Sequence, residues 1–540
     1  MKRLLIPLLA ALATLGGTAT SVASSKLELS TSALESVVIQ EGGRKKPYLV
    51  FSEETLRSLS GKTSVALNGP GAPKSGAMAV LTGIWMDPSQ VWRERELILL
   101  SNRPLKKHLG LDPTRKLFSW NELVANEALG QELLAASETQ KRDPRAKLTG
   151  MQKEASDVAM RMNLLESLLH GDSFRLLPPA AGNEWVAPSA DEMPLVALRG
   201  AWTQGEQQLF DRTAEEFKAL VAMAGAAPPP WKISLEVAYQ KAHPFRWAWM
   251  LYAAAGIILL IARGSWEKRG YRAAASLAAI GFLLQAGGLI SRVLIAGRPP
   301  VTNMYESVIW VAFGTILFAL IFELIYRAGS FLLGAVPVAV ASLILADSQP
   351  MILDRSIHPL TPVLRDNFWL TTHVLSITLS YAAFALALGV AHVALGRIIV
   401  GHKASDALYN YLYKTLQVGV LLLATGTILG GVWANYSWGR FWDWDPKETW
   451  ALTALLGYLF LLHGRLTGLW GGFGLAVGSV LAFMSVLMAW YGVNFVLGAG
   501  LHSYGFGTGG FPLVITFVAF ELLFVLVAFL RKKRLRMRNL

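Results

Sequence analysis

The sequence predicts an all-α polytopic membrane protein of about nine transmembrane helices, preceded by a mostly helical α+β domain. Hydrophobic residues make up 53% of the 540-residue chain and charged residues only 16%, whereas about a quarter of the residues in an average soluble protein are charged. Apolar runs of about 20 residues, the length that crosses a bilayer, follow one another from Arg246 to Leu530. Residues 26–243 contain no such run.

Residues 1–25 have the features of an export signal or of a retained membrane anchor. Lys2 and Arg3 precede an apolar stretch that ends in small residues up to Ala23. In either case we expect residues 26–243 outside the cytoplasm, which in a bacterium is the periplasm. This domain has one strand-like stretch at 96–100, and helical periodicity recurs at 120–137, 150–170 and 206–223.

The positions of the basic residues predict how the helices cross the membrane. A chain that starts outside the cytoplasm and crosses the membrane nine times ends inside it. Six Lys and Arg residues lie within 531–540, so residues 532–540 form a basic cytoplasmic tail. The net charge of +13 therefore reflects membrane orientation, and we expect no nucleic acid as a partner. The predicted spans are 247–264, 273–296, 303–325, 329–347, 371–396, 415–436, 447–467, 472–494 and 513–531.

Tryptophan is concentrated in one outward loop and its flanks. Residues 433–450 contain five tryptophans, where the chain average of 18 in 540 predicts about 0.6. An interfacial aromatic belt explains one or two at a helix end, but not five interleaved with acids. A flat apolar ring with an N–H edge suits a large planar ligand whose rim is polar. The five are Trp433, Trp438, Trp442, Trp444 and Trp450.

Within the same loop, Asp445 is placed as the N-cap of the next helix. Pro446 would take the first helical position and Glu448 the third, which predicts a capping box. For both acids this capping role is at least as well supported as contact with a ligand.

Two histidines are expected at the membrane face that carries the tryptophans. His373 lies at the outer end of its predicted span and His502 in an outer loop. Neutral imidazoles can take both axial positions of a haem iron, although either histidine alone is more typical of an interfacial residue. The chain has no cysteine, so the haem would be b-type and non-covalent, and any thiol would come from a partner.

At this point the sequence resembles a known family. Residues 438–448 resemble the tryptophan-rich WWD domain of haem-handling proteins. Residues 300–307 (PVTNMYES) and 501–504 (LHSY) are similar to the system II cytochrome c biogenesis protein CcsA (ResC), a likeness that covers residues 270–531. The resemblance implies that His373 and His502 are the periplasmic haem ligands, that His463 is a transmembrane ligand, and that the tryptophan loop presents the haem.

Upstream of 270, the layout is similar to the end of the partner protein CcsB (ResB). The additional spans of that partner, which carry the family's second transmembrane histidine, are missing here. His392 lies at a depth similar to His463 and could take the place of that missing histidine as the partner of His463, although a hydrogen bond between packed helices is the favoured explanation. We expect a similar buried hydrogen bond for Glu521, which is costly in a membrane span.

The reaction implied by the resemblance is haem attachment to apocytochrome c. Each thiol of a CxxCH segment adds across a haem vinyl group, so the chain would act as a holocytochrome c synthase in the bacterial inner membrane. Its partners would be haem, apocytochrome c, a CcsB-like subunit and thiol-reducing proteins. A haem transporter that serves a separate ligase, a quinone-binding membrane protein and a scaffold without ligand remain as alternatives.

Overall fold

The computed structural model describes residues 29–538 except 68, 70, 144–145, 147, 179–183, 190, 224–226, 263, 349–351, 361–365 and 499–509. The predicted signal segment, His502 and the rest of the 501–504 motif therefore lie outside the described residues. The chain forms two compact units, Met1–Pro229 and Pro230–Leu540, and each is described by itself.

The first unit is mainly helical. Its described strands form three antiparallel pairs: β1 (Val38–Glu41) with β2 (Arg44–Pro47), β3 (Ser64–Ala66) with β4 (Lys74–Gly76), and β5 (Ile98–Leu99) with β6 (Leu117–Phe118). The helices are η3 (Ser32–Leu34), α1 (Tyr48–Ser60), α2 (Ala77–Met86), α3 (Val91–Glu94), α4 (Arg103–His108), α5 (Trp120–Val124), α6 (Glu127–Arg142), α7 (Gly150–His170), α8 (Met193–Gln204) and α9 (Gln207–Met223).

Local sequence signals account for these elements. Helix α7 begins at a capping box between Thr149 and Gln152 and ends at Gly171, whose φ of 85° is left-handed. The helical periodicity predicted for 120–137, 150–170 and 206–223 corresponds to α5 with α6, to α7 and to α9, and the strand predicted at 96–100 contains β5.

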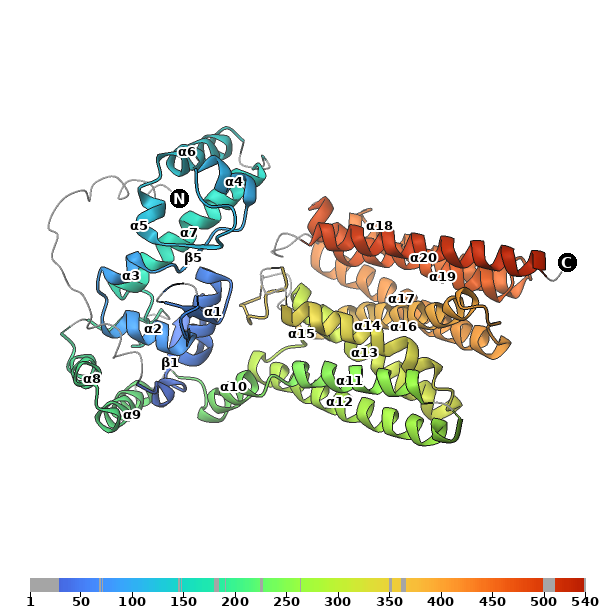
Figure 1. Ribbon diagram of the computed structural model, residues 1–540, viewed down its shortest axis with the longest axis horizontal. Helices are drawn as coiled ribbons and strands as arrows, with labels where there is room; N and C mark the ends of the chain where they lie inside the picture. The colour runs from blue at the N-terminus through green and yellow to red at the C-terminus, as the bar shows by residue number, and fades with distance from the viewer. Residues whose placement is uncertain are drawn as a thin grey trace. The chain divides into compact units, whose positions relative to one another are not determined.

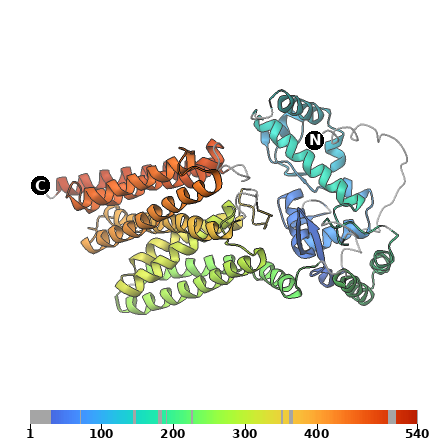
Figure 2. The same cartoon turned by 180° about the vertical axis from the view of Figure 1, so that it is seen from behind.

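The second unit is a bundle of long helices that run side by side in both views (Figures 1 and 2). Its elements are α10 (Pro230–Ala242), α11 (Pro244–Ile261), η4 (Gly264–Trp266), α12 (Glu267–Ala296), α13 (Met304–Tyr326), α14 (Ser330–Ser348), α15 (Asn367–Trp369), η6 (Leu370–Val374), α16 (Leu375–Ile399), α17 (Asp406–Trp438), α18 (Pro446–Leu466), α19 (Gly472–Leu487), η7 (Met488–Leu497) and α20 (Phe511–Arg538).

Within the described residues, eight helical segments are long and apolar enough to cross a membrane, so the chain is a polytopic membrane protein. They overlap eight of the nine predicted spans. The ninth, 447–467, forms helix α18 but is not among the eight, because Lys447, Glu448, His463 and Arg465 make it less apolar. Helix α18 nevertheless packs against α17 and α19 in the bundle.

Helix α16 lies at the centre of the bundle, in contact with α13, α14, α17, α19 and α20. Small residues allow its closest approach: a Cβ built on Gly389 would lie 2.1 Å from the carbonyl oxygen of Gly334 on α14. Because lipid supplies little hydrophobic force between helices, close backbone packing of this kind contributes much of their association.

A buried ion pair fixes the start of α13. Arg292 of α12 lies 2.6 Å from Glu306, and their side chains are 2% and 1% exposed. Glu306 also accepts hydrogen bonds from the backbone N–H and hydroxyl of Thr302, at 2.9 and 2.7 Å, while Asn303 caps the helix. The 300–307 motif therefore fixes the start of α13, and the first turn of this helix lines the pocket described next.

Candidate functional site

A pocket of about 1070 Å³, a volume that includes the part open to solvent, lies within the second unit. Its walls come from the start of α13, from η6, from the start of α16, from α17, from the loop that follows it, from the start of α18 and from η7. Two of these wall segments, η6 and η7, are π-helical. π-Helical segments are rare in proteins overall, but those that occur often lie at functional sites. They alter the direction of side chains relative to an α-helix.

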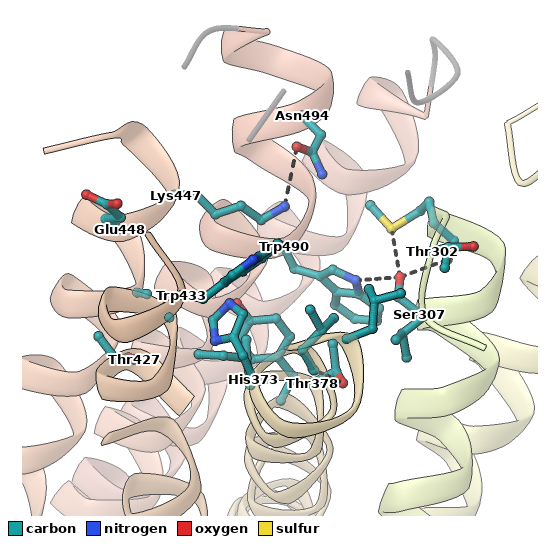
Figure 3. A pocket seen from close by; sticks show the side chains of 18 of the residues that line it. Thr302, Ser307, His373, Thr378, Thr427, Trp433, Lys447, Glu448, Trp490 and Asn494 are labelled. Carbon is teal, nitrogen blue, oxygen red and sulfur yellow. Dashed lines mark hydrogen bonds between the residues drawn. The ribbon is translucent and has the colours of Figure 1, made fainter. Parts of the chain in front are cut away.

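His373 projects from η6 into this pocket (Figure 3). Its Nδ1 donates a hydrogen bond to the Gly426 carbonyl oxygen at 2.8 Å. In the neutral ring this bond places the proton on Nδ1 and the lone pair on Nε2, which is the form that ligates iron. A Cβ on Gly430 would lie 2.5 Å from His373 Cε1, so a glycine there leaves room for the imidazole.

Of the five tryptophans predicted to form the ligand surface, Trp433 and Trp442 line the pocket. Trp433 packs beside His373, with ring centroids 5.6 Å apart. The other three lie away from the lining: Trp438 is 6.1 Å from Trp433, Trp444 contacts Trp442 edge-on at 5.8 Å, and Trp450 packs against the helix core. Trp444 is 69% exposed and has a left-handed φ of 57°, an uncommon conformation for a bulky residue.

Asp445 and Glu448 form the capping box that the sequence predicts. The Asp445 side chain accepts from the Lys447 N–H at 2.9 Å. Glu448 Oε2 accepts from the N–H groups of Asp445 and Asp443, at 3.3 and 3.0 Å. These bonds hold the tryptophan loop against the start of α18.

Several lining residues were not identified as site residues from the sequence, among them Ser307, Lys447, Trp490 and Asn494. Trp490 Nε1 donates to Ser307 Oγ at 2.9 Å, and Lys447 Nζ donates to Asn494 Oδ1 at 3.4 Å (Figure 3). Trp490 and Asn494 belong to η7, inside a run that reads as a continuous apolar span. Lys447 belongs to the capping segment, where the sequence drew attention to its acidic neighbours.

The two inner histidines lie elsewhere. His463 is an exposed residue of α18, and its Nδ1 donates to the Leu459 carbonyl oxygen at 2.8 Å. His392 faces Glu521 of α20, with 3.0 Å between Nε2 and Oε2. In the described part of the chain, no group of three or more His, Cys, Asp or Glu residues is placed to hold a metal ion.

Residues 301–502 match the family described as cytochrome C assembly protein, and every lining residue named above falls in this range. Protein NrfI of Wolinella succinogenes is 28% identical over 524 residues, which cover 89% of this chain and 55% of NrfI. The chain therefore spans about half the length of NrfI, and the match includes most of both units.

Two shorter relatives match part of the chain. Cytochrome c biogenesis protein CcsA of Guillardia theta is 34% identical over 244 residues, 40% of this chain and 79% of its own. The CcsA of Synechococcus sp. (strain CC9902) is 34% identical over 266 residues, 42% of this chain and 85% of its own.

Proposed function

The chain belongs to the cytochrome c assembly family, and from this premise we propose that it holds haem beside His373 and presents it for covalent attachment to apocytochrome c. Membership alone indicates cytochrome c maturation and haem handling in general. The attachment step, the form of the haem and the side of the membrane are the parts we propose.

The observation that carries the proposal is the setting of His373. Its Nδ1–H is engaged by the Gly426 carbonyl oxygen, which makes Nε2 the nitrogen suited to ligate iron, and Trp433 and Trp442 supply flat apolar walls. Aromatic rings of this kind stack on a planar macrocycle. By resemblance, His502 would be the second residue that holds the haem iron, and the haem would be b-type and non-covalent.

The chemistry requires little from the chain beyond positioning. The thiol hydrogen and sulfur of a substrate cysteine add across a vinyl C=C bond, the sulfur forms the thioether, and no net oxidation occurs. Both thiols belong to the apocytochrome, since this chain has no cysteine. Holding the vinyl groups near the thiols replaces a bimolecular encounter with an oriented one, which can lower a barrier by several kcal/mol.

The proposed setting is the bacterial inner membrane, with the pocket on the periplasmic face. The basic tail supports this orientation by the positive-inside rule. A CcsB-like subunit and thiol-reducing proteins are the further partners we propose, because the substrate thiols must be reduced before they react.

The test is maturation of a c-type cytochrome in a bacterial host whose own maturation system has been deleted. We expect the wild-type chain to produce covalent haem on the cytochrome after denaturing electrophoresis, and His373→Ala to produce none. His402→Ala, at an exposed residue between α16 and α17, is the matched control and should behave as wild type.

A second arm separates attachment from transport. The purified, haem-loaded protein is mixed with a reduced CxxCH peptide, and thioether formation is followed by mass spectrometry. Haem that leaves the protein without forming a thioether would indicate a transporter for a separate ligase. A preparation with no haem absorption would contradict the haem proposal altogether.

A further inference from the structure

The pocket contains one strongly basic side chain among its described lining residues. Lys447 is the only lysine or arginine there, and Glu448 is the only acid. Glu448 uses its carboxylate to cap α18, and Figure 3 shows it pointing away from the pocket. Lys447 extends the other way, toward Asn494 of η7, so its ammonium group lies over the pocket that His373 enters from below.

Helix stability does not explain this lysine. It occupies the first turn of α18, the end of a helix where the macrodipole disfavours a cation. Its surroundings also include the apolar faces of Trp433 and Trp490, among which a charge is costly, and the Asp445 carboxylate supplies an opposite charge nearby. An anionic ligand in the pocket would add a second opposite charge and offset the cost of burying the ammonium group further.

Haem has the matching chemistry, with two propionate carboxylates on one edge and vinyl groups on the other side of the ring. We propose that Lys447 and Asn494 bind a haem propionate and so fix the rotation of the macrocycle about the His373–iron axis. The ammonium supplies a point charge and the amide N–H₂ a second donor to the same carboxylate. The vinyl groups are then turned away from Lys447, toward the incoming thiols.

This inference rests on the proposed function and makes Lys447 a positioning residue. Its test is a titration of the purified full-length protein, after acid-acetone removal of haem, with haem and with haem dimethyl ester, followed by the Soret band. The ester keeps the iron, the ring and the vinyl groups but has lost both negative charges.

For the wild-type protein we expect haem to bind about tenfold more tightly than the ester, a typical value for a charge-assisted hydrogen bond. Lys447→Met should lower the affinity for haem about tenfold and leave the affinity for the ester unchanged. Lys447→Arg should restore most of the difference. Lys403→Met removes the same charge from an exposed loop and should change neither affinity.

The bound orientation gives an independent readout. Proton NMR of the low-spin complex resolves the two orientations of the macrocycle that differ by a half-turn about the His373–iron axis. We expect one orientation in the wild-type protein and a mixture in Lys447→Met.

Equal affinities of the wild-type protein for haem and ester, or an equal loss of both in Lys447→Met, would overturn the propionate assignment while leaving the haem pocket intact. The proposed function itself would fail if neither haem nor the ester bound the wild-type protein. It would also fail if His373→Ala bound both ligands as tightly as the wild-type protein does.

Discussion

His392 and Glu521 meet between α16 and α20, with 3.0 Å between the imidazole Nε2 and the carboxylate Oε2. The other ring nitrogen donates to the Leu388 carbonyl oxygen at 2.8 Å. Both ring nitrogens therefore face oxygen atoms of the protein. Glu521 is only 2% exposed, and the ring of Phe524 stacks on His392 at 4.6 Å.

This ion-pair contact places Glu521 against a polar side chain of a neighbouring helix, although its Oε2 makes no hydrogen bond within the described residues, and it bears on the proposed role of His392. The buried hydrogen bond expected for Glu521 stays a prediction. An imidazole whose Nε2 faces a carboxylate cannot offer that nitrogen to iron unless the pair separates. We therefore regard His392 as a residue that joins α20 to α16.

The first prediction concerns this pair. His392→Gln and Glu521→Gln should each lower the thermal stability of the detergent-solubilised protein, and the double variant should lose less than the sum. A coupling free energy of about 1 kcal/mol is expected, as for other polar contacts between membrane helices. Haem binding should be unchanged in all three variants. Loss of haem from either single variant would instead support ligation by His392.

The second prediction concerns Arg292 and Glu306. Glu306→Gln leaves the Arg292 guanidinium buried without its countercharge, and breaking such a pair costs about 3–5 kcal/mol. We expect a large fall in the unfolding temperature. The surface pair Arg246 and Asp347 is the matched control, because exposed pairs contribute at most about 1 kcal/mol and Asp347→Asn should have little effect. Similar losses in both variants would contradict a special role for the buried pair.

The positions of the helices follow from the sequence because apolar length is a local property. The runs that predict 303–325 and 371–396 correspond to Met304–Tyr326 and to the segment that ends at Ile399. Helix α18 shows the limit of this signal, since its polar residues lower its apolar character while neighbouring helices still hold it in the bundle.

The site is less accessible to sequence reasoning, because it depends on tertiary contacts. His373, Trp433 and Trp442 were predicted from residue type and spacing, and all three line the pocket. The π-helical turns have no simple sequence pattern. Trp490 reaches the pocket only because η7 directs it toward Ser307, which lies 183 positions away in the sequence.

The third prediction separates tryptophans that line the pocket from those that do not. Trp442→Ala removes a lining ring and should lower haem occupancy, by at least the order of 1 kcal/mol that aromatic stacking contributes. Trp444→Ala removes an exposed ring that contacts Trp442 and does not line the pocket, so its effect should be clearly smaller. The haem-to-protein ratio of the purified variants measures the difference. A larger loss in Trp444→Ala would indicate that the exposed face of the loop binds the haem.

The fourth prediction tests whether the placement of His373, and not merely its presence, determines binding. In Gly430→Ala the new Cβ would lie 2.5 Å from His373 Cε1, so the ring must move although the ligand itself is intact. The hydrogen bond to Gly426 and the contact with Trp433 limit where it can go. We expect haem affinity to fall about tenfold, or 1.4 kcal/mol.

Gly457→Ala is the matched control on α18, where a Cβ would meet nothing within 4 Å. Because alanine is favoured over glycine inside a helix by about 1 kcal/mol, both substitutions should tend to stabilise their helices when no clash occurs. Gly430→Ala should thus lose haem without a matching loss of helical structure by circular dichroism, whereas Gly457→Ala should keep both. Unchanged haem affinity in Gly430→Ala would mean that the imidazole is free to shift, and that the Gly426 hydrogen bond does not set its orientation.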